Sequence, residues 1–322
     1  MRRITYRDAL REALREEMLR DERIFVMGED IGEYGGQYKV TEGLVKEFGE
    51  SRVRDTPISE AGFVGAAVGA ALTGMRPVVE IMFNDFLTCC MDQIVNAAAK
   101  TKYVHGGGVS VPVVIRTPGG ARCGGPVHSQ CLESWFIHVP GLKVVMPSSP
   151  YDAKGLLKTA IRDDSPVMFF EHKEYTIKGE VPEEEYTIPL GRADIKREGS
   201  DVTVLATSRN VFRALEAGEE LEKQGINIEV LDLRTLVPLD KEAIVDSIKK
   251  TKRAVVVEEG VKTGGVGAEI IAVIMENAFD YLDAPVERVA ALDAPIPNSM
   301  ELMNQIIPGK GHIVDAIRKL VQ

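Results

Sequence analysis

Long apolar runs are missing from this sequence. No stretch approaches the roughly 20 consecutive apolar residues that a membrane-spanning helix needs. The first residues lead directly into a charged amphipathic segment, without the apolar region and cleavage site of a signal peptide. We therefore expect a cytoplasmic protein that has no membrane partner.

Cysteine is scarce and positive charge is in deficit. The 39 basic residues face 49 acidic ones, and the net charge of −10 disfavours nucleic acid and anionic lipid as partners. The cysteines have neither the paired spacing of a zinc site nor a redox Cys-x-x-Cys pattern. In a reducing compartment we expect four free thiols that act as buried filler, at Cys89, Cys90, Cys123 and Cys131.

Nucleotide-binding fingerprints are absent as well. The glycines at 62, 65 and 69 fall inside a predicted helix, where their small size lets another backbone approach closely. The run Gly264-Gly-Val-Gly267 precedes a helix but lacks the Gly-x-Gly-x-x-Gly spacing. No Gly-x-x-x-x-Gly-Lys-Ser/Thr run occurs either. An NAD enzyme is therefore a poor fit.

What the sequence does contain is a repeated alternation of strand and helix patterns. Its 322 residues suffice for two domains, and 44% hydrophobic residues predict real cores. The alternation predicts two doubly wound α/β domains with mostly parallel sheets, at residues 1–185 and 186–322. The acidic, irregular stretch around residues 175–200 would connect them.

Local signals place several elements within the first domain. Thr5-x-x-Asp8 resembles a capping box, and Leu10, Leu14 and Met18 follow at helical spacing. Another helix is predicted around residues 86–103. A glycine-rich loop, Gly119 to Pro126, follows a predicted strand and ends at His128, and loops of this kind often carry function.

An acidic residue stands at the predicted start of another helix. Ser59 is a good N-cap residue, and Glu60 would lie in the first turn. Taken alone, Glu60 would only complement the helix dipole, which stabilises a helix by about 0.3–1 kcal/mol. The surrounding motifs change this interpretation.

Many short motifs, in order along the whole chain, resemble the β subunits of the thiamine-diphosphate-dependent component of 2-oxo acid and acetoin dehydrogenase complexes. They include Arg54-Asp-Thr-Pro-Ile-Ser-Glu60, Gly74-Met-Arg-Pro-Val-Val-Glu80, Met91-Asp-Gln-Ile-Val-Asn96, His128-Ser-Gln130, Pro140-Gly-Leu-Lys-Val-Val145, Asp152-Ala-Lys-Gly-Leu156, Asp232-Leu-Arg-Thr-Leu236 and Gly264-Gly-Val-Gly-Ala-Glu269. The resemblance implies a pyrimidine-binding domain followed by a transketolase C-terminal-like domain.

The resemblance also implies roles for single residues. Glu60 would hydrogen-bond the aminopyrimidine ring of thiamine diphosphate and help its amino group to act as a base. Phe86 would pack against that ring, although a core aromatic is an equally good interpretation, and Ile58 would line the pocket. His128 would stabilise negative charge at the reacting centre, or help in protonation and acyl transfer to lipoamide. The run that precedes His128, Arg122-Cys-Gly-Gly-Pro-Val, departs from the family pattern.

Family members often hold a structural potassium ion through backbone carbonyls and one aspartate. Oxygen ligands suit a hard cation. Ser165 stands where relatives commonly have Asn. The matching positions are Val113, Ala160, Ile161, Asp163 and Ser165.

One half of the family's cofactor site is missing from the chain. The diphosphate–magnesium motif, Gly-Asp-Gly followed by an asparagine pair, does not occur, and Gly28-Glu-Asp30 is the nearest string. The resemblance therefore implies an α subunit that supplies magnesium and the diphosphate site in an α2β2 heterotetramer, and a dihydrolipoyl acyltransferase core that accepts the acyl group.

Pyruvate is the expected substrate, with acetoin and branched-chain 2-oxo acids as alternatives. These substrates differ by few contacts, each worth about 1–3 kcal/mol per methylene. A subunit of a split transketolase and a non-catalytic scaffold are more distant alternatives. The joint presence of Glu60, Phe86 and His128 argues against the scaffold.

Overall fold

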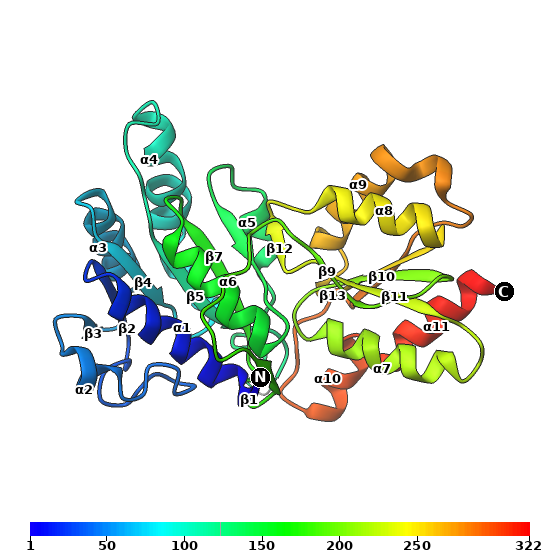
Figure 1. The fold of residues 1–322 in the computed structure, drawn as a ribbon, viewed down its shortest axis with the longest axis horizontal. Coiled ribbons are helices and arrows are strands. Elements are labelled where there is room, and N and C mark those ends of the chain that lie inside the picture. The colour runs from blue at the N-terminus through cyan, green and yellow to red at the C-terminus, as the bar shows by residue number, and fades with distance from the viewer. Residues whose placement is uncertain (123) are drawn as a thin grey trace. The chain divides into compact units, whose positions relative to one another are not determined.

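The chain folds into two compact α/β units (Figure 1). The computed structural model describes residues 1–122 and 124–322. The first unit comprises residues 1–119 and 135–190, and the second comprises residues 120–134 and 191–322. Residues 186–190, which the prediction placed in the second domain, pack with the first unit. Residues 120–134, which it placed in the first domain, pack with the second unit.

The first unit is built on a parallel sheet whose strands are fully buried at its centre. Helices cover both faces of such sheets, so even the polar residues of its central strands are buried. In spatial order they are β6 (Lys143–Val145), β7 (Val167–His172), β5 (Val114–Gly119), β4 (Arg76–Glu80), β2 (Ile24–Gly28) and β3 (Val53–Asp55).

The helices of the first unit follow the predicted periodicity. Thr5 caps α1, because its hydroxyl oxygen accepts a hydrogen bond from the Asp8 backbone N–H at 3.1 Å. Leu10, Leu14 and Met18 are all buried, as predicted. The helices are α1 (Tyr6–Arg20), α2 (Leu44–Phe48), α3 (Glu60–Leu72), η1 (Asn84–Cys90), η2 (Gln93–Ala98), α4 (Ala99–Val104), α5 (Glu133–Ile137), which begins in the second unit, and α6 (Pro150–Arg162).

Two local predictions differ from the structure. The single helix expected around residues 86–103 is three short ones: η1 is a 3₁₀-helix, η2 is a π-helix and only α4 is α-helical. The region expected to be irregular contains β8 (Lys178–Val181) and β9 (Asp194–Arg197). β8 pairs antiparallel with β1 (Arg2–Thr5), and such a pairing between distant segments leaves no local sequence signal.

The second unit is a doubly wound sheet with helices on both faces. Figure 1 shows α8 and α9 on one face and α7 and α11 on the other. In spatial order the strands are β14 (Glu287–Ala291), β13 (Ala254–Val261), β10 (Val202–Ala206), β11 (Ile228–Asp232) and the antiparallel β9, with β12 (Thr235–Val237) outside this sheet. The helices are α7 (Asn210–Glu222), α8 (Lys241–Thr251), α9 (Val266–Ala278), η3 (Phe279–Tyr281), α10 (Met300–Ile306) and α11 (Lys310–Val321). The predicted fold class, two doubly wound α/β domains, is confirmed.

Three cysteines can be compared with the prediction. Cys89 and Cys90 are free thiols, and Cys131 is partly exposed. Cys90 is buried as expected, but Cys89 is exposed, so its interpretation as buried filler is wrong. Cys123 lies outside the described residues. None of the helices in residues 1–122 and 124–322 is both long and apolar enough to cross a membrane.

Candidate active site

The carboxyl end of β2 and the start of α3 bring two acidic side chains together in the first unit. Glu60 occupies the first turn of α3 and is only 9% exposed, and Glu29, directly after β2, is equally buried. Burial raises the pKa of Glu29, and the charges of Glu60 and then Asp30 raise it further, while a hydrogen bond from the Ser59 backbone N–H lowers it. Two buried carboxyl groups that interact in this way are a common feature of functional sites.

Ser59 does not cap α3 with its side chain. Its hydroxyl donates to the Pro57 carbonyl at 3.1 Å instead, and no side-chain hydrogen bond reaches the first backbone N–H groups of the helix. Ser59 is the N-cap residue of α3, as predicted, but its hydroxyl makes no capping hydrogen bond. Glu60 then supplies the negative charge at the positive end of the helix dipole.

The 3₁₀-helix η1 lies beside Glu60. Burial raises the pKa of the Cys90 thiol to about 12, and the Glu60 carboxylate adds to this shift. Within η1, Phe86 is half-buried and meets Phe83 edge to face, with 5.8 Å between the ring centroids. The first unit thus brings Phe86 to the same neighbourhood as Glu60.

Ile58 and one face of α3 are open in this chain. Ile58 is 84% exposed, although it is large and apolar. Gly62, Ala66 and Gly69 are exposed along α3, and nothing lies within 4 Å of a Cβ built on Gly69. An exposed apolar residue beside a face of small residues is typical of a surface that a ligand or another chain covers.

Glu29 is a candidate site residue that the sequence motifs do not indicate. Gly28-Glu-Asp30 matches the diphosphate motif only in part. The available signal was its position, because ligands of parallel α/β sheets bind outside the carboxyl ends of the strands. Glu29 Oε1 is buried and has no hydrogen-bond partner among the described residues. An acceptor of this kind fits a ligand that donates a proton or a hydrogen bond.

His128 belongs to the second unit, whereas Glu60, Phe86 and Ile58 belong to the first. It is half-buried at the end of the glycine-rich loop. Gly120 N–H donates to the Gln130 carbonyl at 3.3 Å, and His128 N–H donates to the Gly125 carbonyl at 3.3 Å, so the loop closes on itself. Gly124 has φ +143°, and a Cβ there would lie 2.7 Å from Cβ of His128. Only glycine fits this close approach.

An acidic cluster lies behind the loop in the second unit. Burial raises the pKa of Glu133 to about 7, and the charges of Glu258 and Glu259 add to this shift. Glu258 is compensated by Arg288, with 2.5 Å between Glu258 Oε1 and Arg288 Nη2. Glu259 pairs with Arg213 at 3.0 Å.

Comparison with known proteins identifies the two units. The family model of the transketolase pyrimidine binding domain matches residues 2–177, and that of the transketolase C-terminal domain matches residues 191–313. A pyruvate dehydrogenase E1 component subunit beta from Rickettsia felis is 50% identical over 98% of both chains. This chain belongs to the E1 β-subunit family. It combines a transketolase pyrimidine binding domain with a transketolase C-terminal domain.

Other members of the E1 β-subunit family are almost as similar. The β subunit of an acetoin:2,6-dichlorophenolindophenol oxidoreductase from Bacillus subtilis is 47% identical, covering 99% of this chain and 97% of its own. The β subunit of a 2-oxoisovalerate dehydrogenase from the same organism is also 47% identical, covering 99% of each chain. A solved split gene transketolase, described as an inactive β4 tetramer, has a TM-score of 0.82 at 24% identity, covering 99% of this chain and 98% of its own, and supports the fold alone.

The residues predicted to hold potassium gather at the end of α6. Asp163 is the C-cap residue of α6, and its backbone N–H donates to the Ala160 carbonyl at 3.3 Å. Arg76 Nε donates to the Ile161 carbonyl at 2.9 Å, and Ser165 N–H donates to the Asp163 carboxylate at 2.8 Å. Val113 is joined to this region because its carbonyl accepts the Val167 N–H at 2.9 Å.

Lysine and arginine side chains already contact several oxygens of the predicted potassium site. The Asp163 carboxylate pairs with the Lys143 ammonium, and Arg76 donates to the Asp163 carbonyl at 2.7 Å. A carbonyl oxygen has two lone pairs, so one remains on each of the carbonyls that accept a single hydrogen bond. Across residues 1–122 and 124–322, no three His, Cys, Asp or Glu side chains are grouped as metal ligands.

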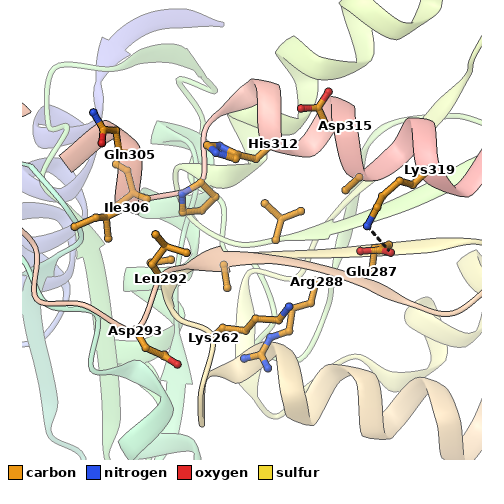
Figure 2. A pocket seen from close by; sticks show the side chains of 16 residues that line it. Lys262, Glu287, Arg288, Leu292, Asp293, Gln305, Ile306, His312, Asp315 and Lys319 are labelled. Atoms are coloured by element: carbon orange, nitrogen blue, oxygen red, sulfur yellow. Dashed lines mark hydrogen bonds and ion pairs between the residues drawn. The ribbon is translucent and has the colours of Figure 1, made fainter. Parts of the chain in front are cut away.

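A separate cavity of about 430 Å³ lies within the second unit (Figure 2). β14 and its continuation to Asp293 form one side, and α11 forms the other. Figure 2 shows Lys319 of α11 paired with Glu287 of β14, with 3.4 Å between Nζ and Oε1. The described lining includes none of the residues predicted for the cofactor.

Proposed function

We propose that this E1 β subunit works with an α subunit in the thiamine-diphosphate-dependent oxidative decarboxylation of pyruvate, with acyl transfer to lipoamide. The observation that carries the proposal is the buried carboxyl group of Glu60. It lies in the first turn of α3 and interacts with the buried Glu29. Thiamine diphosphate, when bound, supplies the carbanion chemistry. Glu60 would exchange a proton with the aminopyrimidine ring and would so favour the form whose amino group acts as a base.

Phe86 and Ile58 would make the apolar contacts with the same cofactor. The edge-to-face contact with Phe83 fixes the Phe86 ring, which would pack against the pyrimidine. Ile58 precedes Glu60 by two positions and is exposed in this chain, so a bound cofactor and a partner chain would cover it. Burial of its side chain would stabilise that complex by about 1.5–3 kcal/mol.

His128 acts on the substrate side. In a neutral imidazole one ring nitrogen donates and the other accepts, which suits either stabilisation of negative charge at the reacting centre or proton transfer during acyl transfer. The closed backbone of its loop and the tight contact with Gly124 restrict the side chain. Such restriction is what a catalytic histidine needs.

An α subunit completes the enzyme in an α2β2 heterotetramer and holds magnesium with the diphosphate. The diphosphate motif is absent from this sequence, and the exposed small-residue face of α3 provides a surface for close helix contact. A dihydrolipoyl acyltransferase core would accept the acyl group. The cytoplasmic location stays a prediction from the sequence.

Acetoin and branched-chain 2-oxo acids remain alternative substrates, because relatives of nearly equal identity are named for them. A split transketolase subunit is supported only by the shared fold. A non-catalytic scaffold would not need a buried Glu60 that interacts with a second carboxyl group.

The proposal is tested by reconstitution with an E1 α subunit. Reduction of an artificial electron acceptor would be followed with pyruvate, acetoin, 2-oxoisovalerate and a ketose phosphate. We expect the highest kcat/KM with pyruvate. Preference for acetoin or 2-oxoisovalerate would change the substrate, and activity only with the ketose phosphate would contradict the dehydrogenase assignment.

We also propose a potassium ion at the end of α6, held by the carbonyls of Val113, Ala160 and Ile161 together with Asp163 and Ser165. Support comes from the negative end of the helix dipole and the carboxylate at its C-cap. Thermal unfolding in KCl and in choline chloride should differ by several degrees, and Asp163→Asn should remove the difference. Equal midpoints for the unmodified chain would contradict the site.

A further inference from the structure

The loop that carries His128 is held by residues far away in the sequence. All of them belong to the second unit: Glu259 on β13, Asn298 before α10, and an apolar cluster in which Ala121 packs with Ile296, Met303 and Ile307. These contacts fix the backbone at Ala121 and at Gly124. His128 follows four residues later.

Glu259 holds the backbone at Ala121. Its carboxylate is buried, and one oxygen accepts a hydrogen bond from the Ala121 backbone N–H. The other oxygen accepts from Arg213 at 3.0 Å, and the same Arg213 nitrogen donates to the Asn210 amide oxygen at 2.8 Å. Charge-assisted hydrogen bonds of this kind are stronger than neutral ones. Glu259 therefore fixes Ala121 to the start of α7.

Asn298 holds the backbone at Gly124. Its amide oxygen accepts a hydrogen bond from the Gly124 backbone N–H at 3.3 Å, and its Cβ lies 3.7 Å from a Cβ built on Gly125. Gly124 in turn lies directly against His128, where a built Cβ would come within 2.7 Å of the histidine Cβ. A shift of Gly124 would therefore move His128.

We infer that Asn298 and Glu259 are positioning residues that set the place of His128 through its loop. This inference rests on the catalytic role proposed for His128. Neither residue touches the reacting atoms in this account, and both act through backbone N–H groups. Small displacements of a catalytic group have large effects on rate, because a shift of about 1 Å can reduce turnover by 10²-fold.

Asn298→Ala is the first test, because Asn298 is exposed and its replacement should leave the fold intact. In the reconstituted α2β2 enzyme we expect kcat for pyruvate to fall about 10-fold. The affinity for thiamine diphosphate and the unfolding midpoint should stay unchanged. Asn298→Asp keeps an oxygen acceptor for Gly124 N–H and should restore most of kcat. Asn277→Ala is the matched control: Asn277 is also exposed, and its side chain donates to the Val273 carbonyl of its own helix, at 2.8 Å.

Hydrogen exchange separates this inference from the proposed function. Asn298→Ala should speed amide exchange in residues 124–131 whether or not His128 is catalytic. Unchanged exchange in this segment would overturn the inference, and so would faster exchange with unchanged kcat. The role of His128 is tested separately by His128→Ala: if that variant keeps full activity, the proposed function loses its acyl-transfer residue while the exchange result stands.

Glu259 provides a second, independent test. Glu259→Gln keeps an acceptor for Ala121 N–H, whereas Glu259→Ala removes it. We expect kcat to fall further in the alanine variant than in the glutamine variant, with KM for pyruvate changed less than twofold in both. Equal losses in the two variants would contradict positioning through the Ala121 hydrogen bond.

Discussion

Replacing Glu60 with Gln is expected to lower turnover of the assembled enzyme by roughly 10²- to 10⁴-fold, the range that general acid–base catalysis contributes. Glutamine keeps the size and an oxygen acceptor but cannot exchange a proton with the aminopyrimidine ring. Thermal stability should change little, because the acid contributes only about 0.3–1 kcal/mol at the start of α3. The measurement is steady-state kcat with pyruvate and an artificial electron acceptor.

The matched control for this variant is Glu22→Gln, which alters an exposed glutamate of the same unit. It should leave kcat unchanged. A Glu60→Gln enzyme that keeps more than a tenth of normal turnover would remove Glu60 from its proposed role, because a residue that only complements the helix dipole can be exchanged without loss of activity.

Replacing Arg116 with Met is expected to cost about 3–5 kcal/mol in the free energy of unfolding, the range seen when one partner of a buried ion pair is removed. Arg116 is 1% exposed and lies between two buried carboxylates. Its Nε and Nη2 donate to the two Glu171 oxygens at 2.7 and 2.8 Å, and its Nη1 donates to Glu80. Methionine fills much of the space but leaves both carboxylates unpaired. Urea unfolding followed by far-UV circular dichroism measures the change.

Arg23→Met is the control for that variant. Arg23 pairs with Asp21 at 2.7 Å, but its side chain is 56% exposed, and such surface pairs are worth about 0–1 kcal/mol. A loss of less than 1 kcal/mol in Arg116→Met as well would show that the two carboxylates become protonated or reach water. Burial already raises the pKa of Glu80, although the charge of Arg116 opposes this shift.

Much of the fold could be predicted because its signals involve residues that are near one another in the sequence. The capping contact between Thr5 and Asp8 and the buried row Leu10, Leu14 and Met18 follow from helical spacing alone. β8 was missed because it is a short, largely exposed edge strand that exists through its pairing with β1, where Arg2 faces Val181. The π-helix η2 likewise has no signal in the helical pattern of residues 86–103.

The candidate site was only partly predictable. Glu60 could be predicted only from the motifs that resemble a family. Its position at a helix start is explained equally well by complementation of the helix dipole. Glu29 was missed because its burial and its interaction with Glu60 arise only when β2 and α3 are folded. Asn298 is 174 positions from Gly124, and no local pattern connects the two.

We propose that this chain holds only the pyrimidine half of the cofactor site. The most direct test is isothermal titration of thiamine diphosphate and magnesium into the purified chain alone, and into the same chain assembled with its α subunit. We predict no measurable binding at micromolar concentration for the chain alone and tight, stoichiometric binding for the assembled enzyme. Equally tight binding by the isolated chain would contradict the account.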